Sequence, residues 1–190
     1  MKINCPKCCK IISKILGIVL FVVISFNANA LKWHKKNIDS VLELSFPKKP
    51  IHFPLTEQGL ERYICQQGGC YFSLSIRDSI IDDYYGYLLA SDSTRESWAN
   101  STLNWVIDSK VNQPFHYLIS KETLRLGYND FGVDIVYATS DLTMAESNKR
   151  FAKLLLLGNS LYILDVWYMD DELHDLEKDK FFKSVSLKRK

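Results

Sequence analysis

The sequence lacks the short motifs that mark the common classes of enzyme. It contains no G-x-S-x-G nucleophile elbow, no H-E-x-x-H zinc motif and no glycine-rich phosphate loop. It also contains no internal repeat and no long low-complexity tract. A catalytic site would therefore have to be assembled from residues that lie far apart in the chain. A hydrolase built in that way is kept as an alternative.

The length and composition are those of one globular domain. The chain has 190 residues, and typical domains have roughly 100–200 residues. Hydrophobic residues make up 47% and charged residues 24% of the sequence, which is ordinary for a globular protein. Phenylalanine and tyrosine each occur 10 times, so the chain has enough large side chains for a sizeable core.

The N-terminal segment has the pattern of a secretory signal peptide. Its basic start is followed by an apolar run, and Ala28 and Ala30 supply the small residues that an export peptidase requires. The uninterrupted apolar run covers about twelve residues, whereas a membrane-spanning helix needs roughly 20. We expect residues 1–30 to be a signal peptide and the mature protein to be periplasmic or secreted, without stable membrane insertion after cleavage. An uncleaved membrane anchor is the alternative.

Cleavage would change both the charge and the cysteine count. Four of the 24 basic residues and none of the 22 acidic residues lie in residues 1–30, which leaves 20 basic and 22 acidic residues. No excess of positive charge then remains to attract a nucleic acid, so we expect no nucleic-acid partner. Three of the five cysteines lie in the same segment, so two remain.

The two remaining cysteines, Cys65 and Cys70, flank the segment QQGG. A catalytic dithiol typically has the spacing C-x-x-C at the start of a helix, and a zinc site needs three or four ligands. An even pair in an oxidising compartment favours a structural disulfide over these two alternatives. We expect Cys65 and Cys70 to face each other across a hairpin with a four-residue loop and to form a disulfide. We assign no metal ligand and no cofactor.

Strand and helix patterns predict the fold class. Two pairs of strand-like runs form hairpins, one around residues 66–69 and one around Gly158-Asn159. The arms of the second hairpin are nearly all apolar, so it should lie at the centre of a sheet. Residues 93–111 have helical spacing after a capping box, and a second helix should begin near Asp170. The order predicts an α+β sandwich, a mainly antiparallel β-sheet with helices packed on it.

The same patterns predict the domain organisation. Residues 31–40 are polar, and we expect them to be a flexible lead-in. Residues 41–190 should form a single α+β domain.

Three stretches of the sequence together suggest a known family: Phe46-Pro47, the segment from Gly158 to Tyr162, and the segment from Phe181 to Leu187. They resemble the PsbP-like family. The best-known members of this family are extrinsic lumenal subunits of the oxygen-evolving complex, and a Ran-binding nuclear-import factor shares the fold. The resemblance implies a PsbP-like α/β sandwich and a non-enzymatic protein that docks on other proteins, in some members with a divalent metal nearby. It carries no metal ligand over to this chain.

Two groups of residues are the remaining site candidates. Tyr84, Tyr85 and Tyr87 lie beside two aspartates, and tyrosines beside acids suit a partner interface as well as packing under a loop. Asp165 is isolated in an apolar strand, where burial could raise its pKa, and it is paired here with His116 as a possible ionisable site. Ordinary pairing or exposure of Asp165 is the alternative.

The acidic segment of residues 170–177 could bind calcium, but it lacks the D-x-D-x-D-G spacing of a calcium loop. A solvated start of a helix is the simpler interpretation. We therefore expect an exported, non-catalytic accessory or protein-binding module. Its partner would be another exported protein or a component of a membrane complex. A divalent-metal-dependent binding protein is a further alternative beside the hydrolase.

Overall fold

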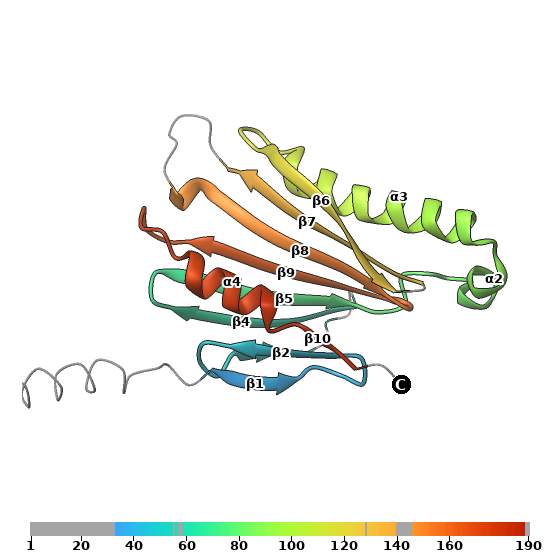
Figure 1. Cartoon of the computed structure of the whole chain (residues 1–190), viewed down its shortest axis with the longest axis horizontal. Coiled ribbons are helices and arrows are strands. Elements are labelled where there is room, and N and C mark those ends of the chain that lie inside the picture. The colour runs from blue at the N-terminus through green and yellow to red at the C-terminus, as the bar shows by residue number, and fades with distance from the viewer. Residues whose placement is uncertain (1–32, 55, 57–58, 128, 140–145, 189–190) are drawn as a thin grey trace, which may run out of the picture. The chain divides into compact units, whose positions relative to one another are not determined.

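A computed structural model describes residues 33–54, 56, 59–127, 129–139 and 146–188 (Figure 1). The expected signal peptide lies outside these residues. Within them, strands arranged in two antiparallel sheets are packed with helices, which confirms the predicted α+β class. No described helix is both long and apolar enough to cross a membrane.

The larger sheet has seven strands in the order β3-β4-β5-β9-β8-β7-β6. Its strands are Ile51–Phe53 (β3), Leu60–Gln67 (β4), Cys70–Arg77 (β5), Tyr117–Gly127 (β6), Asp130–Ala138 (β7), Lys149–Leu157 (β8) and Ser160–Tyr168 (β9). Every neighbouring pair is antiparallel. The apolar hairpin β8–β9 lies at the centre of the sheet, as the sequence predicted. Both of its faces are covered over much of their length.

The smaller sheet has three strands in the order β1-β2-β10 and joins the two ends of the described chain. Its strands are His34–Asn37 (β1), Leu42–Phe46 (β2) and Ser186–Leu187 (β10). The prediction of a flexible lead-in over residues 31–40 is therefore wrong for β1. The side chains of β1 are exposed, so no alternation marks the strand in the sequence. Backbone pairing with β2 forms it, and Asp39 stabilises the turn by accepting hydrogen bonds from the amides of Val41 and Leu42.

The helices are Tyr84–Leu89 (α2), Asp92–Val111 (α3) and Asp175–Lys183 (α4), and a short 3-10 helix spans Glu146–Asn148 (η1). Helix α3 begins slightly earlier than its expected capping box, because the side chain of Ser91 rather than that of Ser93 accepts the capping hydrogen bond, from the amide of Thr94. Helix α4 begins later than expected, at Asp175 after the N-cap His174.

The two faces of the large sheet carry separate cores. On one face, Ala99 and Leu103 of α3 pack on Val133 of β7 and Leu154 of β8. On the other face, α4 and the small sheet cover strands β4, β5 and β9. Phe181 of α4 is fully buried there. The core under α3 includes Leu161 of β9 but no residue of β5 or β4, so α3 covers only part of this face.

Burial along β5 follows the alternation of apolar and polar residues in its sequence, except at Ser73, which is also buried. Cys70, Phe72, Leu74 and Ile76 are buried against α4 and the small sheet, whereas Arg77 is exposed. In α4, Phe181 is buried, whereas Leu176, and Leu173 just before the helix, are exposed.

Candidate binding surfaces

The cysteine pair does not have the arrangement that the sequence predicted. Cys65 lies opposite Phe72, and Cys70 lies opposite Gln67, so the two cysteines are diagonal neighbours rather than a facing pair. Diagonal neighbours have Cα atoms roughly 7–8 Å apart, beyond the roughly 4.4–6.8 Å of most disulfides. Both cysteines are buried free thiols in the structure.

The cause is the turn, which has two residues instead of the expected four. Gly68 and Gly69 both have positive φ angles, of 53° and 72°. Two such residues form the tight turn that matches the twist of a hairpin, so both glutamines join the strand β4. Burial raises the pKa of both thiols, and nearby Glu177 and Asp170 add to the effect at Cys70, whose pKa rises to about 12. Neither thiol has the lowered pKa of a reactive cysteine.

Asp165 and His116 lie around the same lysine. The Nζ atom of Lys110 on α3 donates a hydrogen bond of 2.7 Å to the Oδ1 atom of Asp165 on β9. The Nδ1 atom of His116 lies 2.8 Å from the carbonyl oxygen of Lys110. The lysine ammonium also lies 5.8 Å from the centre of the Tyr137 ring. Asp165 is therefore part of an ion pair that ties α3 to the central strand.

The acidic segment before α4 is held by its own hydrogen bonds. Asp170 Oδ1 lies 2.7 Å from His174 Nε2, and this bond is the main reason why the pKa of Asp170 is lowered. Asp171 Oδ1 accepts a hydrogen bond of 2.6 Å from the hydroxyl of Ser147. Among the described residues, no group of three or more His, Cys, Asp or Glu side chains has the arrangement of a metal site.

The three candidate tyrosines separate into two roles on helix α2. Tyr87 is buried, and its ring meets Trp98 of α3 edge-on with the ring centroids 5.3 Å apart. Tyr84 stacks on Tyr87 and reaches the β8–β9 turn, where a Cβ atom at Gly158 would lie 3.2 Å from its hydroxyl. Tyr85 is 75% exposed. Tyr84 and Tyr87 therefore anchor the helix, and Tyr85 faces solvent.

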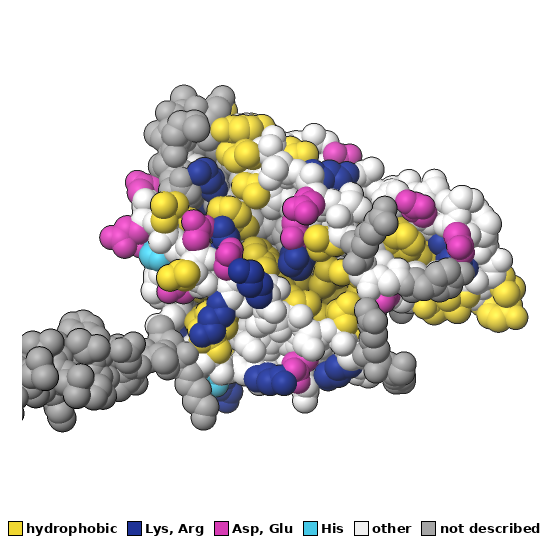
Figure 2. Space-filling model, viewed as in Figure 1, with side chains coloured by type: hydrophobic (Ala, Val, Ile, Leu, Met, Phe, Trp, Pro, Cys, Tyr) yellow, Lys and Arg dark blue, Asp and Glu magenta, His cyan; other side chains and the backbone are white. Residues whose placement is uncertain are grey.

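Tyr85 has apolar neighbours on the same short helix. Leu88 and Leu89 are also exposed, by 42% and 71%, and we call Tyr85, Leu88 and Leu89 the α2 patch. Figure 2 shows hydrophobic side chains gathered over α2, with acidic side chains nearby. Asp82 and Asp83, which precede the helix, are exposed.

Helix α2 is fixed to the rest of the molecule at both ends. Asn159 in the β8–β9 turn accepts a hydrogen bond of 2.7 Å from the amide of Ile81 and donates one of 3.3 Å to the carbonyl of the same residue. The buried guanidinium of Arg95 donates to the carbonyls of Leu88 and Ala90, each at 2.9 Å. The α2 patch is thus presented by a rigid helix. The predicted Gly158-Asn159 turn is present, but of these two residues only Gly158 has a positive φ angle.

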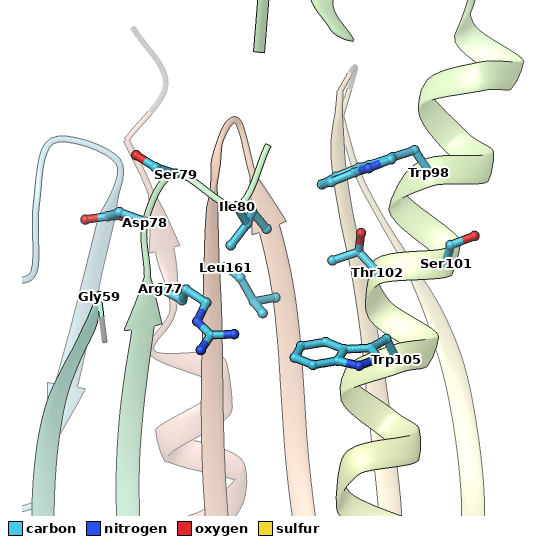
Figure 3. A pocket seen from close by; sticks show the side chains of 10 residues that line it. All are labelled: Gly59, Arg77, Asp78, Ser79, Ile80, Trp98, Ser101, Thr102, Trp105 and Leu161. Atoms are coloured by element: carbon cyan, nitrogen blue, oxygen red, sulfur yellow. The ribbon is translucent and has the colours of Figure 1, made fainter. Parts of the chain in front are cut away.

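A cavity of about 560 Å³ lies between α3 and the ends of β5 and β9, on the face of the sheet that α3 only partly covers (Figure 3). Its lining residues are Gly59, Arg77, Asp78, Ser79, Ile80, Trp98, Ser101, Thr102, Trp105 and Leu161. Neither Asp165 nor His116 lines it. Drug-sized ligands occupy pockets of roughly 300–1,000 Å³, so this cavity is large enough for a small organic molecule.

The sequence does not reveal this cavity, because the helical spacing of Trp98, Thr102 and Trp105 predicts that they face the sheet as part of the core. Trp105 is 59% exposed and is not part of the core under α3. Two tryptophans seven positions apart, with hydroxyl side chains between them, were the available signal.

The comparisons with known proteins concern the fold. No protein-family model and no curated protein matches this chain. Among solved structures, it is similar to the solution structure of cyanobacterial PsbP (CyanoP) from Synechocystis sp. PCC 6803, with 13% sequence identity and a TM-score of 0.51. The match covers 84% of this chain and 94% of that one. The chain therefore has a PsbP-like fold, as the resemblance of its sequence motifs predicted.

Proposed function

We propose that this protein is an exported, non-catalytic accessory module that binds a partner protein through the α2 patch. The observation that carries the proposal is the exposure of Tyr85 and Leu89, by 75% and 71%, on a helix that is hydrogen-bonded at both ends. Aromatic and aliphatic side chains presented on a rigid element resemble the centre of a protein interface. The PsbP-like fold supports an accessory role, by analogy only.

The charges beside the patch define the chemistry of the partner. Asp82, Asp83 and Glu96 are exposed and lie just before α2 or in the first turns of α3. A complementary surface would combine an apolar pocket for Tyr85 and Leu89 with a rim of lysine or arginine. We propose a protein of that kind, exported or part of a membrane complex, as the partner.

Export is part of the proposal. It is supported by the signal-peptide pattern of residues 1–30. N-terminal sequencing of the protein recovered outside the cytoplasm should begin at Leu31. Recovery of an intact N-terminus from the cytoplasm would contradict export, and an intact N-terminus in the membrane fraction would identify the segment as an anchor.

Site-specific photo-crosslinking tests the interface. A photoreactive phenylalanine analogue replaces Tyr85 in the full chain expressed in cells, and a matched probe replaces Phe115, which is 67% exposed on a different segment. We expect an adduct at position 85 that is absent at position 115. The second variant Leu89→Asp should abolish this adduct because it places a charge in the apolar contact, and added salt should weaken it.

The matched control is Leu176→Asp, because Leu176 on α4 is as exposed as Leu89, at 84%. This variant should leave the adduct unchanged. An adduct that survives Leu89→Asp, or one that Leu176→Asp removes equally, would refute the α2 patch as the interface.

A further inference from the structure

We propose that the cavity between α3 and β5 is a binding site for an amphipathic organic anion, a molecule with a flat or extended apolar body and one carboxylate. This site is separate from the α2 patch. It does not depend on the proposed partner, because none of its lining residues belongs to the α2 patch.

The apolar part of the site is formed by the two tryptophans of α3 and by residues from the sheet. In Figure 3 the rings of Trp98 and Trp105 extend from the helix toward the sheet, with Thr102 between them. Ile80 and the buried Leu161 form the opposite side. A ligand body in this space would cover Trp105, which is otherwise 59% exposed. Covering a large aromatic side chain is favourable because it removes apolar area from water.

The charge of the site comes from Arg77 at the end of β5. In Figure 3 its guanidinium points into the cavity toward the ring of Trp105. The cross-strand neighbours of Arg77 are Leu60 and Leu161, neither of which can pair with it. No described side chain forms a hydrogen bond or ion pair with this guanidinium. A guanidinium matches a carboxylate with two parallel hydrogen bonds.

The acidic residue of the lining does not cancel this charge. Figure 3 shows the carboxylate of Asp78 directed away from the guanidinium of Arg77. The Oδ1 atom of Asp78 instead accepts a hydrogen bond of 2.7 Å from the hydroxyl of Ser160. The cavity therefore offers two indole rings and one cation that has no partner among the described side chains. This combination favours an amphipathic anion over a neutral sugar or a cation.

Calorimetric titration of the full chain tests the proposal. The probes are 2-naphthylacetate, its neutral amide, and decanoate below its aggregation concentration. We expect at least one acid to bind, and 2-naphthylacetate to bind about tenfold or more tightly than its amide, since hydrogen bonds to charged groups are the strong ones. The tighter of the two acids distinguishes an aromatic from a fatty-acid source for the natural ligand.

Two variants assign the binding to this cavity. Arg77→Gln should remove the preference for the acid over the amide, and Trp105→Ala should weaken both ligands at unchanged thermal stability. The control is Arg62→Gln, which removes an exposed arginine of the same sheet face that does not line the cavity. It should change neither affinity.

The proposal fails if neither acid binds up to millimolar concentration, or if the amide binds as tightly as the acid. It also fails if Arg77→Gln leaves the acid preference intact, or if Arg62→Gln removes that preference. If Trp105→Ala loses binding and also has a lowered melting temperature, the titration is repeated with Trp105→Phe. This variant keeps the apolar contact and should retain binding.

Discussion

At the scale of single residues, Gly69 illustrates how one position links two segments. It has a φ angle of 72°, and a Cβ atom there would lie 2.4 Å from Asp170 Oδ2 and 2.5 Å from His174 Nε2. The amide of Met169 also donates a hydrogen bond of 2.7 Å to the carbonyl of Gly69. The β4–β5 turn therefore serves as the support for the chain between β9 and α4.

We expect Gly69→Ala to destabilise the protein more than Gly68→Ala. Both substitutions place a side chain at a positive φ angle, which costs roughly 1–2 kcal/mol, but a Cβ atom at Gly68 would have no atom within 4 Å. The additional loss at Gly69 would come from the displaced Asp170–His174 hydrogen bond. Urea unfolding of the two variants measures the difference, and equal losses would contradict this account.

The state of the two cysteines is a second prediction at this scale. Cys65 and Cys70 are buried free thiols with raised pKa values, so alkylation should be very slow in the folded protein. Iodoacetamide should modify both after unfolding without a reductant. Mass spectrometry of the peptides measures this directly, and a cross-linked Cys65–Cys70 peptide would restore the original disulfide prediction.

At the scale of elements, helix α4 is fixed by a carboxylate in its first turn. Asp175 Oδ1 accepts hydrogen bonds from Lys178 Nζ at 2.5 Å and from the hydroxyl of the buried Tyr168 at 2.8 Å. These two bonds lower the pKa of Asp175, with the larger effect from Lys178. The carboxylate is therefore more acidic in the folded protein than in the unfolded chain.

A lowered folded-state pKa means that this stabilisation is present above the unfolded pKa, about 3.9, and is lost as the pH falls through the lower folded value. We expect wild type to be more stable than Asp175→Asn at pH 7 and this advantage to shrink below about pH 4. Thermal melts at several pH values measure it. Asp170 also has a lowered pKa, but it is present in both proteins, so its contribution to the pH dependence of stability cancels in the comparison. An advantage that stays constant down to pH 2 would be the contrary result.

The sequence predicted the buried strands better than it predicted exposed strands and turn lengths. The central position of the β8–β9 hairpin followed from its nearly continuous apolar arms, and the faces of β5 followed from apolar alternation, because burial enforces both patterns. Strand β1 could not be predicted, because its side chains are exposed and show no apolar alternation, and because it forms by pairing with β2. The predicted pairing of β4 with β5 was wrong because the expected loop included both glutamines. A change in loop length changes every cross-strand partner.

For the candidate functional residues, too, the sequence identified unusual residues but not the contacts that they make with distant parts of the chain. Asp165 was recognised as unusual, but its partner Lys110 lies 55 positions earlier in the chain, and the contact exists only because α3 crosses the sheet. The tyrosine cluster was recognised as a surface, yet which of Tyr84, Tyr85 and Tyr87 is exposed depends on how α2 docks against Trp98. The cavity at Arg77 depends on where α3 stops covering the sheet, and no local pattern encodes that limit.

At the scale of the whole molecule, Phe181 couples the two sheets. Its ring lies 5.5 Å from that of Phe46 on β2 and 5.2 Å from that of Phe72 on β5, measured between centroids. The side chain is fully buried in the core between them. The two sheets should therefore unfold together rather than in sequence.

We expect Phe181→Ala to lower the free energy of unfolding by about 3–5 kcal/mol, the usual cost of removing a buried phenylalanine ring. Phe182→Ala is the matched control and should cost less, because Phe182 is only partly buried. Circular dichroism and tryptophan fluorescence should report one coincident urea transition for wild type. Two separate transitions would show that the sheets are independent.

The small sheet has a consequence for how the molecule folds. Strand β2 near the beginning of the domain pairs with β10 at its end, so that Glu43 lies opposite Ser186. A contact between residues so distant in sequence closes a very long loop, and such contacts slow folding. Until the last residues are available, Leu42 and Leu44 lack the cover that α4 and β10 complete. We therefore expect this apolar strand to be exposed until the C-terminal segment has been synthesised, and a chaperone that binds extended apolar segments should recognise that stage rather than the finished protein.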